Sequence, residues 1–287
     1  MAMEIEFNNV SADYKIRPLR TSRVLYDINL KIPPSSFVAI VGKTGAGKSS
    51  LLKTMNGLLL PKEGFVNISE MKIQQNTDKK TLKQVRKKVG MVLQFPESQL
   101  FAETVEKDIS FGPLNYGASP DEAKKLARAS LHLVGLSPDF LSKSPFTLSG
   151  GQKRRVAIAG ILALKPEILL LDEPGVGLDP EGKQEIFQLL KNLNQHSGIS
   201  ILFVTHDMNE VARYAEDVIV MKEGRNIFYG NKRKLFADPD QLTDMHLDVP
   251  DSLRFQRLLE KKIGKKLPKV CLTEEELADC LIEAGYV

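Results

Sequence analysis

The sequence predicts an α/β fold with a parallel core sheet, and three observations support this prediction. Strand-like apolar runs alternate with helix-like segments from residue 36 onward, an order typical of parallel strands joined by right-handed crossovers. A glycine-rich loop connects the first of these strands to a helix. A later run, Ile168–Leu171, is apolar at every position, which is typical of a parallel strand buried on both faces.

The expected elements follow one another in four parts. Residues 5–92 contain an N-terminal antiparallel β layer, a core strand at Ser36–Val41 and a helix at Lys48–Leu58. A mainly helical insertion follows over about 94–155, and Ser119-Pro120-Asp121-Glu122 predicts a helix start within it. The chain then returns to the sheet, with strands at Ile168–Asp172 and Ile199–Thr205, a helix after Pro180, and a hairpin of Asp217–Met221 and Asn226–Tyr229. A small extension, residues 231–287, completes the chain.

The loop Gly42–Ser49 has the pattern G-x-x-x-x-G-K-S. Its glycines permit positive φ angles, so the backbone can curl closely around a phosphate. The free N–H groups and the positive end of the following helix then face the anion. We expect Lys48 to reach the β- and γ-phosphates and the Ser49 hydroxyl to ligate a bridging Mg²⁺.

Two carboxylates follow the apolar run that ends at Leu171. Asp172 is expected at the carboxyl end of this strand, where ligands bind in open α/β sheets. There it would hold Mg²⁺ directly or through water. Glu173 would point toward the γ-phosphate and orient or deprotonate the attacking water. The alternative interpretation of such an acidic pair is a solvated strand end that binds no ligand.

A third motif, LSGGQ at Leu148–Gln152, lies between the loop and the two carboxylates. Together these motifs resemble the nucleotide-binding subunits of ATP-binding cassette (ABC) transporters, and the resemblance covers about Met3 to Gly230. The order of the motifs is the order of that family. The resemblance implies a P-loop ATPase of the ABC cassette type that uses ATP and Mg²⁺.

The resemblance also implies roles for individual residues. Tyr14 corresponds to the aromatic residue that stacks on adenine, and Gln94 to the glutamine that senses Mg²⁺ and the γ-phosphate. Catalysis is assigned to Glu173 and to the switch histidine, His206. The implied ATP-binding residues are Tyr14, Gly42, Lys43, Thr44, Gly45, Ala46, Gly47, Lys48, Ser49, Ser50 and Gln94, and the implied metal-binding residues are Ser49, Gln94 and Asp172. Without the family, Tyr14 reads as core packing and His206 as uninformative.

In this family the phosphate loop of one subunit faces the signature of another, which implies a dimer. Ser149, Gly150, Gly151 and Gln152 would then contact ATP held by the partner, and Asp179 would communicate across the dimer. Plainer interpretations stay open for both. The signature also fits a Gly-Gly turn that caps a helix at Gln152–Leu164, and Asp179 with Pro180 fits a helix start.

The segment Gln94–Val105 resembles the groove in which ABC ATPases receive a coupling helix of a membrane subunit. The sequence of this segment, with Phe95 after Gln94 and Phe111-Gly112-Pro113 downstream, resembles that of energy-coupling factor transporter ATPases and their cobalt and nickel relatives. The resemblance is to the second ATPase of a vitamin-type heterodimer, and a homodimer stays an alternative. It implies a polytopic coupling subunit that docks near Phe95–Phe101 and a separate substrate-binding membrane subunit. An apolar loop packed on its own helical segment is the plainer reading.

One position departs from the family. Gly175 stands where the family often has Thr or Ser, so the loop that leads to Asp179 loses a hydroxyl. Glu173 and His206 are unaffected, and we expect the site formed by this chain's phosphate loop to be competent for hydrolysis.

Composition limits the possible functions. Hydrophobic content of 42% and charged content of 26% describe a soluble globular protein. No apolar run approaches the roughly 20 residues that span a bilayer, so we expect a peripheral protein at the cytoplasmic face of the cell membrane. Cys271 and Cys280 are expected to be reduced thiols. The net charge of +4 and a basic cluster at 79–88 without interleaved aromatic residues argue against nucleic acid as a partner.

Residues 231–287 change in character, with three prolines and a helix start at Thr273-Glu274-Glu275-Glu276. Segments of this size are marginal as independent domains. The family resemblance implies that this extension holds two ATPases together, and a tail folded back on its own core is the alternative. A soluble ABC ATPase of repair or translation is a less favoured class, because it would normally carry two cassettes or a long coiled coil.

Overall fold

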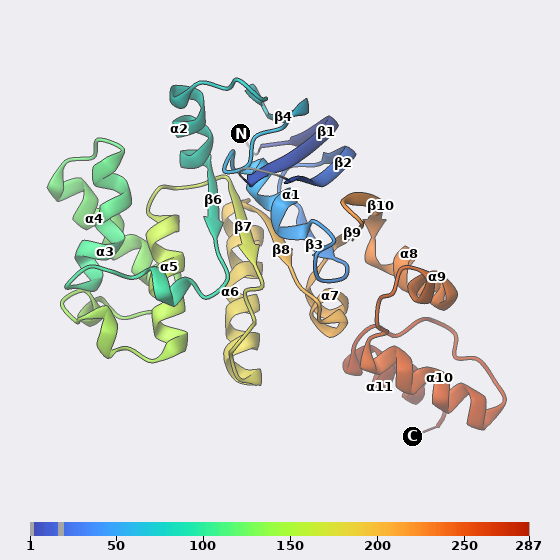
Figure 1. Cartoon of the computed structure of the whole chain (residues 1–287). Helices are drawn as coiled ribbons and strands as arrows, with labels where there is room; N and C mark the ends of the chain where they lie inside the picture. The colour runs from blue at the N-terminus through green and yellow to red at the C-terminus, as the bar shows by residue number, and fades with distance from the viewer. Residues whose placement is uncertain (1–2, 17–19, 287) are drawn as a thin grey trace.

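The computed structural model describes residues 3–16 and 20–286 of the 287-residue chain. Its N-terminal part is a four-stranded antiparallel sheet in the order β2-β1-β4-β5. This sheet lies above the central sheet in Figure 1. Its strands are β1 (Ile5–Ile16), β2 (Arg20–Ile32), β4 (Glu63–Ile68) and β5 (Met71–Ile73).

The central sheet has six strands in the order β10-β9-β3-β8-β7-β6. Strand β3 pairs in parallel with β8 and β9, and β7 pairs in parallel with β8 and β6. The edge strand β10 is antiparallel to β9, as the predicted hairpin requires. The strands are β3 (Phe37–Val41), β6 (Val89–Val92), β7 (Ile168–Asp172), β8 (Ser200–Val204), β9 (Asp217–Lys222) and β10 (Arg225–Asn231). The predicted parallel core is therefore confirmed.

Both faces of the central sheet are buried, which explains the continuous apolar runs. Along β3, alternate side chains enter two different cores. Phe37, Ala39 and Val41 belong to the core that also contains the helical segment between β6 and β7. Val38 and Ile40 belong to the core formed with the antiparallel sheet and with the helix that follows β3. A strand with no solvent-facing side can be apolar at every position.

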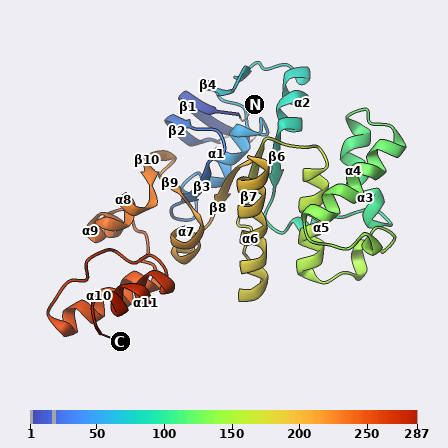
Figure 2. The same cartoon turned by 180° about the vertical axis from the view of Figure 1, so that it is seen from behind.

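Helices pack on both faces of the central sheet and, together with the antiparallel sheet, enclose the two cores (Figures 1 and 2). The helical segment between β6 and β7 lies to one side of the sheet and ends at Leu162. The helices are α1 (Lys48–Met55), α2 (Lys79–Lys88), α3 (Val105–Asn115), α4 (Pro120–Leu133), α5 (Gly150–Leu162), α6 (Pro180–Ser197) and α7 (Met208–Tyr214), with short 3-10 helices η1 (Pro96–Gln99), η2 (Pro138–Phe140) and η3 (Pro145–Thr147).

Two helix boundaries illustrate how the sequence acts locally. The Ser119 side chain accepts a hydrogen bond from the Glu122 N–H and caps α4, so the predicted start is confirmed. Helix α1 ends at Met55, three residues earlier than the predicted Leu58. Asn56 is its C-cap, and Gly57 has a φ of 68°, in the left-handed region that ends helices.

The C-terminal extension forms four helices at the lower right of Figure 1. They are α8 (Lys232–Ala237), α9 (Pro239–Asp244), α10 (Asp251–Ile263) and α11 (Glu274–Glu283). Leu235, Phe236 and Leu253 enter the core beneath the helices of the cassette, and Arg213 pairs with Glu274. The extension is thus packed against the core of its own chain, which was the alternative to a role in holding two ATPases together.

Candidate functional site

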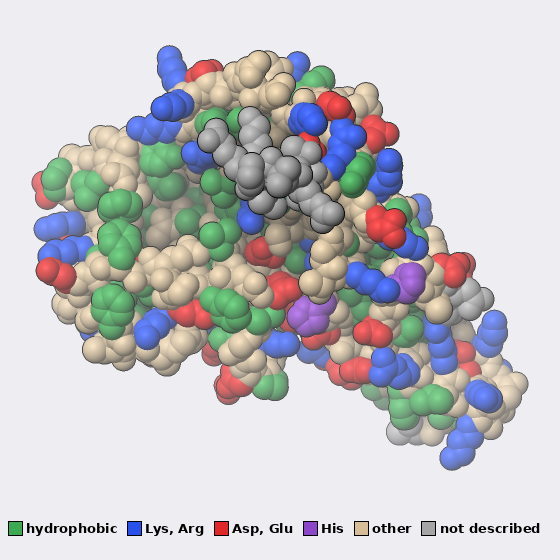
Figure 3. Space-filling model, in the orientation of Figure 1, with side chains coloured by type: hydrophobic (Ala, Val, Ile, Leu, Met, Phe, Trp, Pro, Cys, Tyr) green, Lys and Arg blue, Asp and Glu red, His purple; other side chains and the backbone are tan. Residues whose placement is uncertain are grey.

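A cavity of about 800 Å³ lies at the carboxyl ends of the central strands. Figure 3 shows acidic and histidine side chains gathered near the centre of this side of the molecule. The residues that line the cavity come from six separate parts of the chain, and they are Val24, Gly42, Lys43, Thr44, Gly45, Gly47, Lys48, Ser49, Ser50, Gln94, Asp172, Glu173, Val204, His206, Met208, His246, Leu247 and Asp248.

The phosphate loop wraps the upper part of this cavity. Gly42, Gly45 and Gly47 have φ angles of 139°, 82° and 101°, so the predicted positive φ is confirmed at all three. At Gly42 the packing also excludes a side chain, since a β-carbon would lie 2.2 Å from the Met221 carbonyl oxygen. Helix α1 starts directly after Gly47 without a side-chain cap. Its first N–H groups therefore face the cavity, as an anion site requires.

Lys48 is held at the centre of the loop. Its ammonium group donates hydrogen bonds to the carbonyl oxygens of Gly42, at 2.6 Å, and Lys43, at 3.0 Å. Burial lowers the pKa of Lys48, and the carboxylates of Glu173 and Asp172 act against this shift. The ammonium group is therefore desolvated and oriented before any anion arrives.

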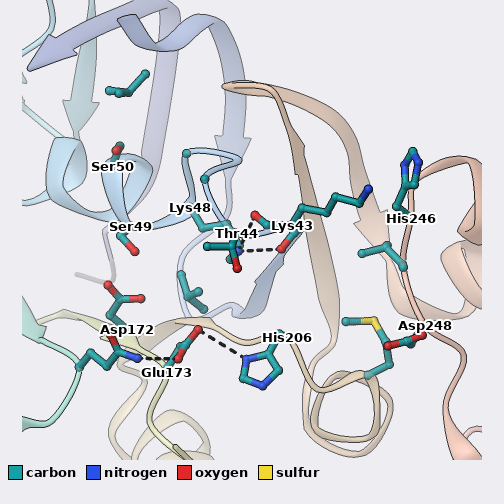
Figure 4. A pocket seen from close by; sticks show the side chains of 18 residues that line it. Lys43, Thr44, Lys48, Ser49, Ser50, Asp172, Glu173, His206, His246 and Asp248 are labelled. Carbon is teal, nitrogen blue, oxygen red and sulfur yellow. Dashed lines mark hydrogen bonds and ion pairs between the residues drawn. The ribbon is translucent and has the colours of Figure 1, made fainter. Parts of the chain in front are cut away.

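Ser49 and Asp172 bring two oxygen donors to the floor of the cavity (Figure 4). Burial raises the pKa of Asp172, and the adjacent Ser49 hydroxyl opposes this rise. A cation between them would relieve the cost of burying this carboxylate. In the described part of the chain, no group of three or more His, Cys, Asp and Glu side chains is arranged to hold a metal.

Glu173 has polar partners on two sides, Gln94 and His206, and Figure 4 shows His206 beside it. The Gln94 Nε2 donates to Glu173 Oε2 at 2.8 Å, and His206 Nδ1 lies 3.5 Å from Glu173 Oε1. Glu173 also has a φ of 53°, which is rare for a residue with a side chain and concentrates at functional sites. The fold thus assembles a carboxylate, an amide and an imidazole from three segments.

Tyr14 lies near the loop without lining the cavity. The Ser50 hydroxyl donates to its phenolic oxygen at 3.4 Å, and the Lys53 ammonium group lies 5.7 Å from its ring centre. The ring is half-buried against the core around α1. This position is compatible with both predicted readings, adenine stacking and core packing.

The signature lies at the start of α5, outside the cavity lining. Ser149 and Gln152 form a reciprocal capping box, in which each side chain bonds the backbone N–H of the other. Gly150 and Gly151 belong to the helix itself and not to a preceding turn. A β-carbon at either glycine would meet no atom within 4 Å. The open side of the signature is therefore accessible to another molecule.

Asp179 also lies outside the cavity lining. Its side chain accepts a hydrogen bond from Gly182 N–H at 3.0 Å and caps α6, which confirms the predicted helix start. The loop from Glu173 to Asp179 connects this cap to the catalytic candidates.

The extension reaches the cavity, which no sequence pattern indicated. His246, Leu247 and Asp248, from the segment between α9 and α10, line the cavity, and Figure 4 shows His246 and Asp248 on the side away from Asp172. Val24 of β2 and Met208 of α7 complete the lining. These residues form no local motif, so only the folded chain reveals them.

Comparison with known proteins agrees with this geometry. The family model described as ABC transporter matches residues 25–176. An energy-coupling factor transporter ATP-binding protein, EcfA2, from Geobacillus kaustophilus is 50% identical over 279 residues, which cover 97% of this chain and 96% of that protein. The EcfA2 of Listeria monocytogenes serovar 1/2a is 49% identical over 275 residues, 96% of each chain.

Solved structures show the same fold. CbiO1 from Clostridium perfringens, described as part of the ABC transporter complex CbiONQ, superposes with a TM-score of 0.75 at 34% identity, covering 92% of this chain and 98% of that one. The dimeric cassette MJ0796, in a post-hydrolysis state bound to ADP and Pi, gives a TM-score of 0.70 at 35% identity, covering 80% of this chain and 99% of its own. The chain therefore belongs to the ABC transporter family, among the energy-coupling factor transporter ATP-binding proteins.

Proposed function

We propose that this chain is the ATP-binding and ATP-hydrolysing subunit that powers an energy-coupling factor importer of vitamins or other micronutrients. One observation supports this most directly. A single cavity brings together Lys48, Asp172, Glu173 and His206, whereas the signature around Ser149 lies outside it. One chain therefore holds two half-sites, and a complete site needs a second ATPase.

The cavity supports ATP hydrolysis with Mg²⁺. Ser49, Asp172 and Gln94 are the proposed metal-binding residues, and their oxygen donors suit this hard cation. A Mg²⁺ ion held by these residues would supply positive charge that neutralises the charge developing on the phosphates during hydrolysis. Glu173 orients the attacking water and accepts its proton, and His206 contacts the γ-phosphate. The remaining ATP-binding residues are those of the loop, with Tyr14 at the adenine.

The second ATPase completes the site from the other side. In the proposed dimer, the signature N–H groups and the Ser149 hydroxyl bind the γ-phosphate held by the partner. A β-carbon at Gly150 or Gly151 would meet no atom within 4 Å, so this side of the signature leaves room for the approach. Asp179, at the end of the Glu173 loop, faces the partner's site. A heterodimer is proposed, because the name EcfA2 of the similar relatives implies a second, different ATPase. A homodimer is the alternative.

Membrane attachment is assigned to the segment near Phe95–Phe101. The side chains of Phe95, Phe101 and Phe111 are 46%, 59% and 50% exposed, and Phe101 and Phe111 stack edge to face. An exposed aromatic patch of this kind is typical of a docking surface. Among the described residues, no helix is both long and apolar enough to cross a bilayer. The proposed location is the cytoplasmic face of the membrane, through a polytopic coupling subunit and a separate substrate-binding subunit.

The extension, residues 231–287, is proposed to stabilise the ATPase dimer in addition to packing on its own cassette. Its outer surface exposes Phe255 and Leu258 on α10 and Ile282 on α11, at 55%, 64% and 60%. Large apolar side chains that remain exposed after packing favour a further contact.

The second candidate is the ATPase of a cobalt or nickel importer, favoured by the likeness to CbiO1 but at lower identity. Mass spectrometry of proteins that co-purify with the tagged chain from solubilised membranes separates the candidates. A different cassette ATPase with a polytopic protein and small hydrophobic subunits supports the vitamin-type complex. This chain alone with a membrane protein supports the homodimeric metal type, and no membrane protein contradicts both.

A further inference from the structure

Arg154 is a buried charge that the proposed chemistry does not use. It lies on α5, two residues after the signature, and its side chain is only 3% exposed. Its guanidinium group makes hydrogen bonds in two directions. Nη1 donates to the carbonyl oxygens of Pro174, at 2.7 Å, and Val176, at 2.9 Å. Nε and Nη2 face the carboxylate of Glu97, with the closest contact at 3.3 Å.

The two sets of partners belong to segments with different proposed tasks. Glu97 is in η1, inside the segment proposed to dock the membrane subunit. Pro174 and Val176 flank Gly175 in the loop between Glu173 and Asp179. The same segments also approach each other at Phe95, whose ring lies 3.8 Å from where a Gly177 β-carbon would stand.

The geometry makes this connection stiff. A guanidinium is planar and presents its donors in a fixed fork, so it can hold a carboxylate and two carbonyl groups at once. The two accepting carbonyls are backbone atoms, and their positions follow the path of the loop. Movement of Glu97 away from Arg154 costs free energy, because it leaves a buried arginine without its carboxylate partner. Movement of the docking segment is therefore passed to the loop that carries Glu173 and Asp179.

We propose that Arg154 is a positioning residue that couples the docking segment to the catalytic loop, so that hydrolysis depends on the state of the membrane subunit. The proposal rests on the proposed function, in particular on docking near Phe95–Phe101. Arg154 does not touch nucleotide in this scheme, and ATP affinity should not depend on it.

The test uses the complete complex in proteoliposomes and measures solute uptake and phosphate release together. Arg154→Gln should lower the ratio of uptake to hydrolysis at least about fivefold, while the KM for ATP stays within about twofold. Glu97→Gln should lower the same ratio, and the double variant should be no worse than either single variant, because both remove one connection. Arg154→Lys keeps the charge without the fork and should rescue the ratio only in part.

The matched control is Arg155→Gln, one residue along α5, because Arg155 bonds to Val134 and Glu185 and to neither of these two segments. Its ratio should remain that of the wild type. An unchanged ratio in Arg154→Gln, or additive losses in the double variant, would overturn the proposal. If Arg154→Gln does not assemble, Glu97→Gln and Arg154→Lys decide by the same ratio. A wild-type chain that fails to assemble with any membrane subunit would instead contradict the proposed function.

Discussion

The carboxylate of Glu210 occupies the space that a side chain at Gly175 would need. A β-carbon built on Gly175 would lie 2.6 Å from Glu210 Oε1. This carboxylate is also fixed from other sides, since the Thr205 hydroxyl donates to Oε2 at 2.6 Å and the Lys183 ammonium group lies 3.5 Å from Oε1. Burial raises the pKa of Glu210, and the Thr205 hydroxyl opposes this rise. The Glu210 side chain on α7 thus fills the space that the Thr or Ser often found at position 175 in the family would need.

Gly175→Ala is expected to destabilise the chain by about 1 to 3 kcal/mol, because the added methyl group displaces a fixed carboxylate. In a Glu210→Ala background the same substitution should cost much less, since the space is then free. Urea unfolding of the four proteins measures this coupling. Gly160→Ala is the control, because its β-carbon would meet its nearest atom only at 4.0 Å. Equal costs in both backgrounds would contradict the interpretation.

Lys48→Ala should weaken ATP binding itself. The substitution removes a charged donor from the phosphate loop, and such hydrogen bonds contribute roughly 1.5 to 3 kcal/mol, about a 10- to 100-fold rise in Kd. Titration calorimetry without turnover measures this value. Lys79→Ala, on the exposed N-terminal turn of α2, serves as the control. An unchanged Kd for Lys48→Ala would show that the loop does not hold the phosphates.

Glu173→Gln should bind ATP and hydrolyse it at least about 100-fold more slowly, because the carboxylate acts on water and not on the nucleotide. ATP that is not hydrolysed should then hold two ATPase subunits together. Light scattering detects this as a dimer that does not dissociate. Glu70→Gln, on an exposed turn of the antiparallel sheet, is the matched control. Near-normal phosphate release from a complex whose second site is disabled would refute the role of Glu173 as the base.

Asp172→Asn should raise the thermal stability of the nucleotide-free chain near neutral pH. Burial raises the pKa of Asp172 above its unfolded value, so the folded state binds this proton more tightly than the unfolded state. Ionisation of Asp172 therefore costs stability above its folded pKa and costs nothing below its unfolded pKa. The gain in Tm should shrink as the pH falls through the raised folded pKa of Asp172 toward its ordinary unfolded value.

The same variant should lose the extra stabilisation that Mg²⁺ adds to ATP, because the metal would lose a ligand. Differential scanning calorimetry with ATP alone and with ATP plus Mg²⁺ separates the gain in Tm of the chain from the loss of Mg²⁺ stabilisation. A Tm gain that stays constant with pH would contradict the assigned cause, and a full Mg²⁺ effect would contradict the metal site.

The double variant Phe255→Ser and Leu258→Ser should weaken association with the second ATPase, if the outer face of α10 lies in the dimer contact. Point variants are preferable to removing residues 231–287, because Leu235 and Phe236 are part of the cassette core. Light scattering of the purified pair measures the change. Ile227→Ser, an exposed apolar position on β10, is the control. If the mass of the ATPase pair is unchanged, the extension does not stabilise the dimer through this face.

Much of the fold follows from local pattern alone. The apolar runs at Phe37–Val41 and Ile168–Asp172 read as two-sided strands, because only a sheet covered on both faces tolerates them. Ser119 and Asp179 capped the predicted helices, because a short polar side chain can bond the free N–H groups of the first turn. At the end of α1, where Asn56 and Gly57 stop the helix, the predicted boundary was wrong by three residues.

The sequence by itself determined the phosphate loop, the strands and the order of the motifs, because these depend on backbone preferences and on residues adjacent in the chain. The tertiary structure alone decided which distant groups meet. It brought Gln94 and His206 to Glu173, Arg154 to Glu97, Glu210 to Gly175, and residues 246–248 to the cavity. Such contacts depend on the order of strands in the sheet and on the packing of whole elements, and no local pattern encodes either.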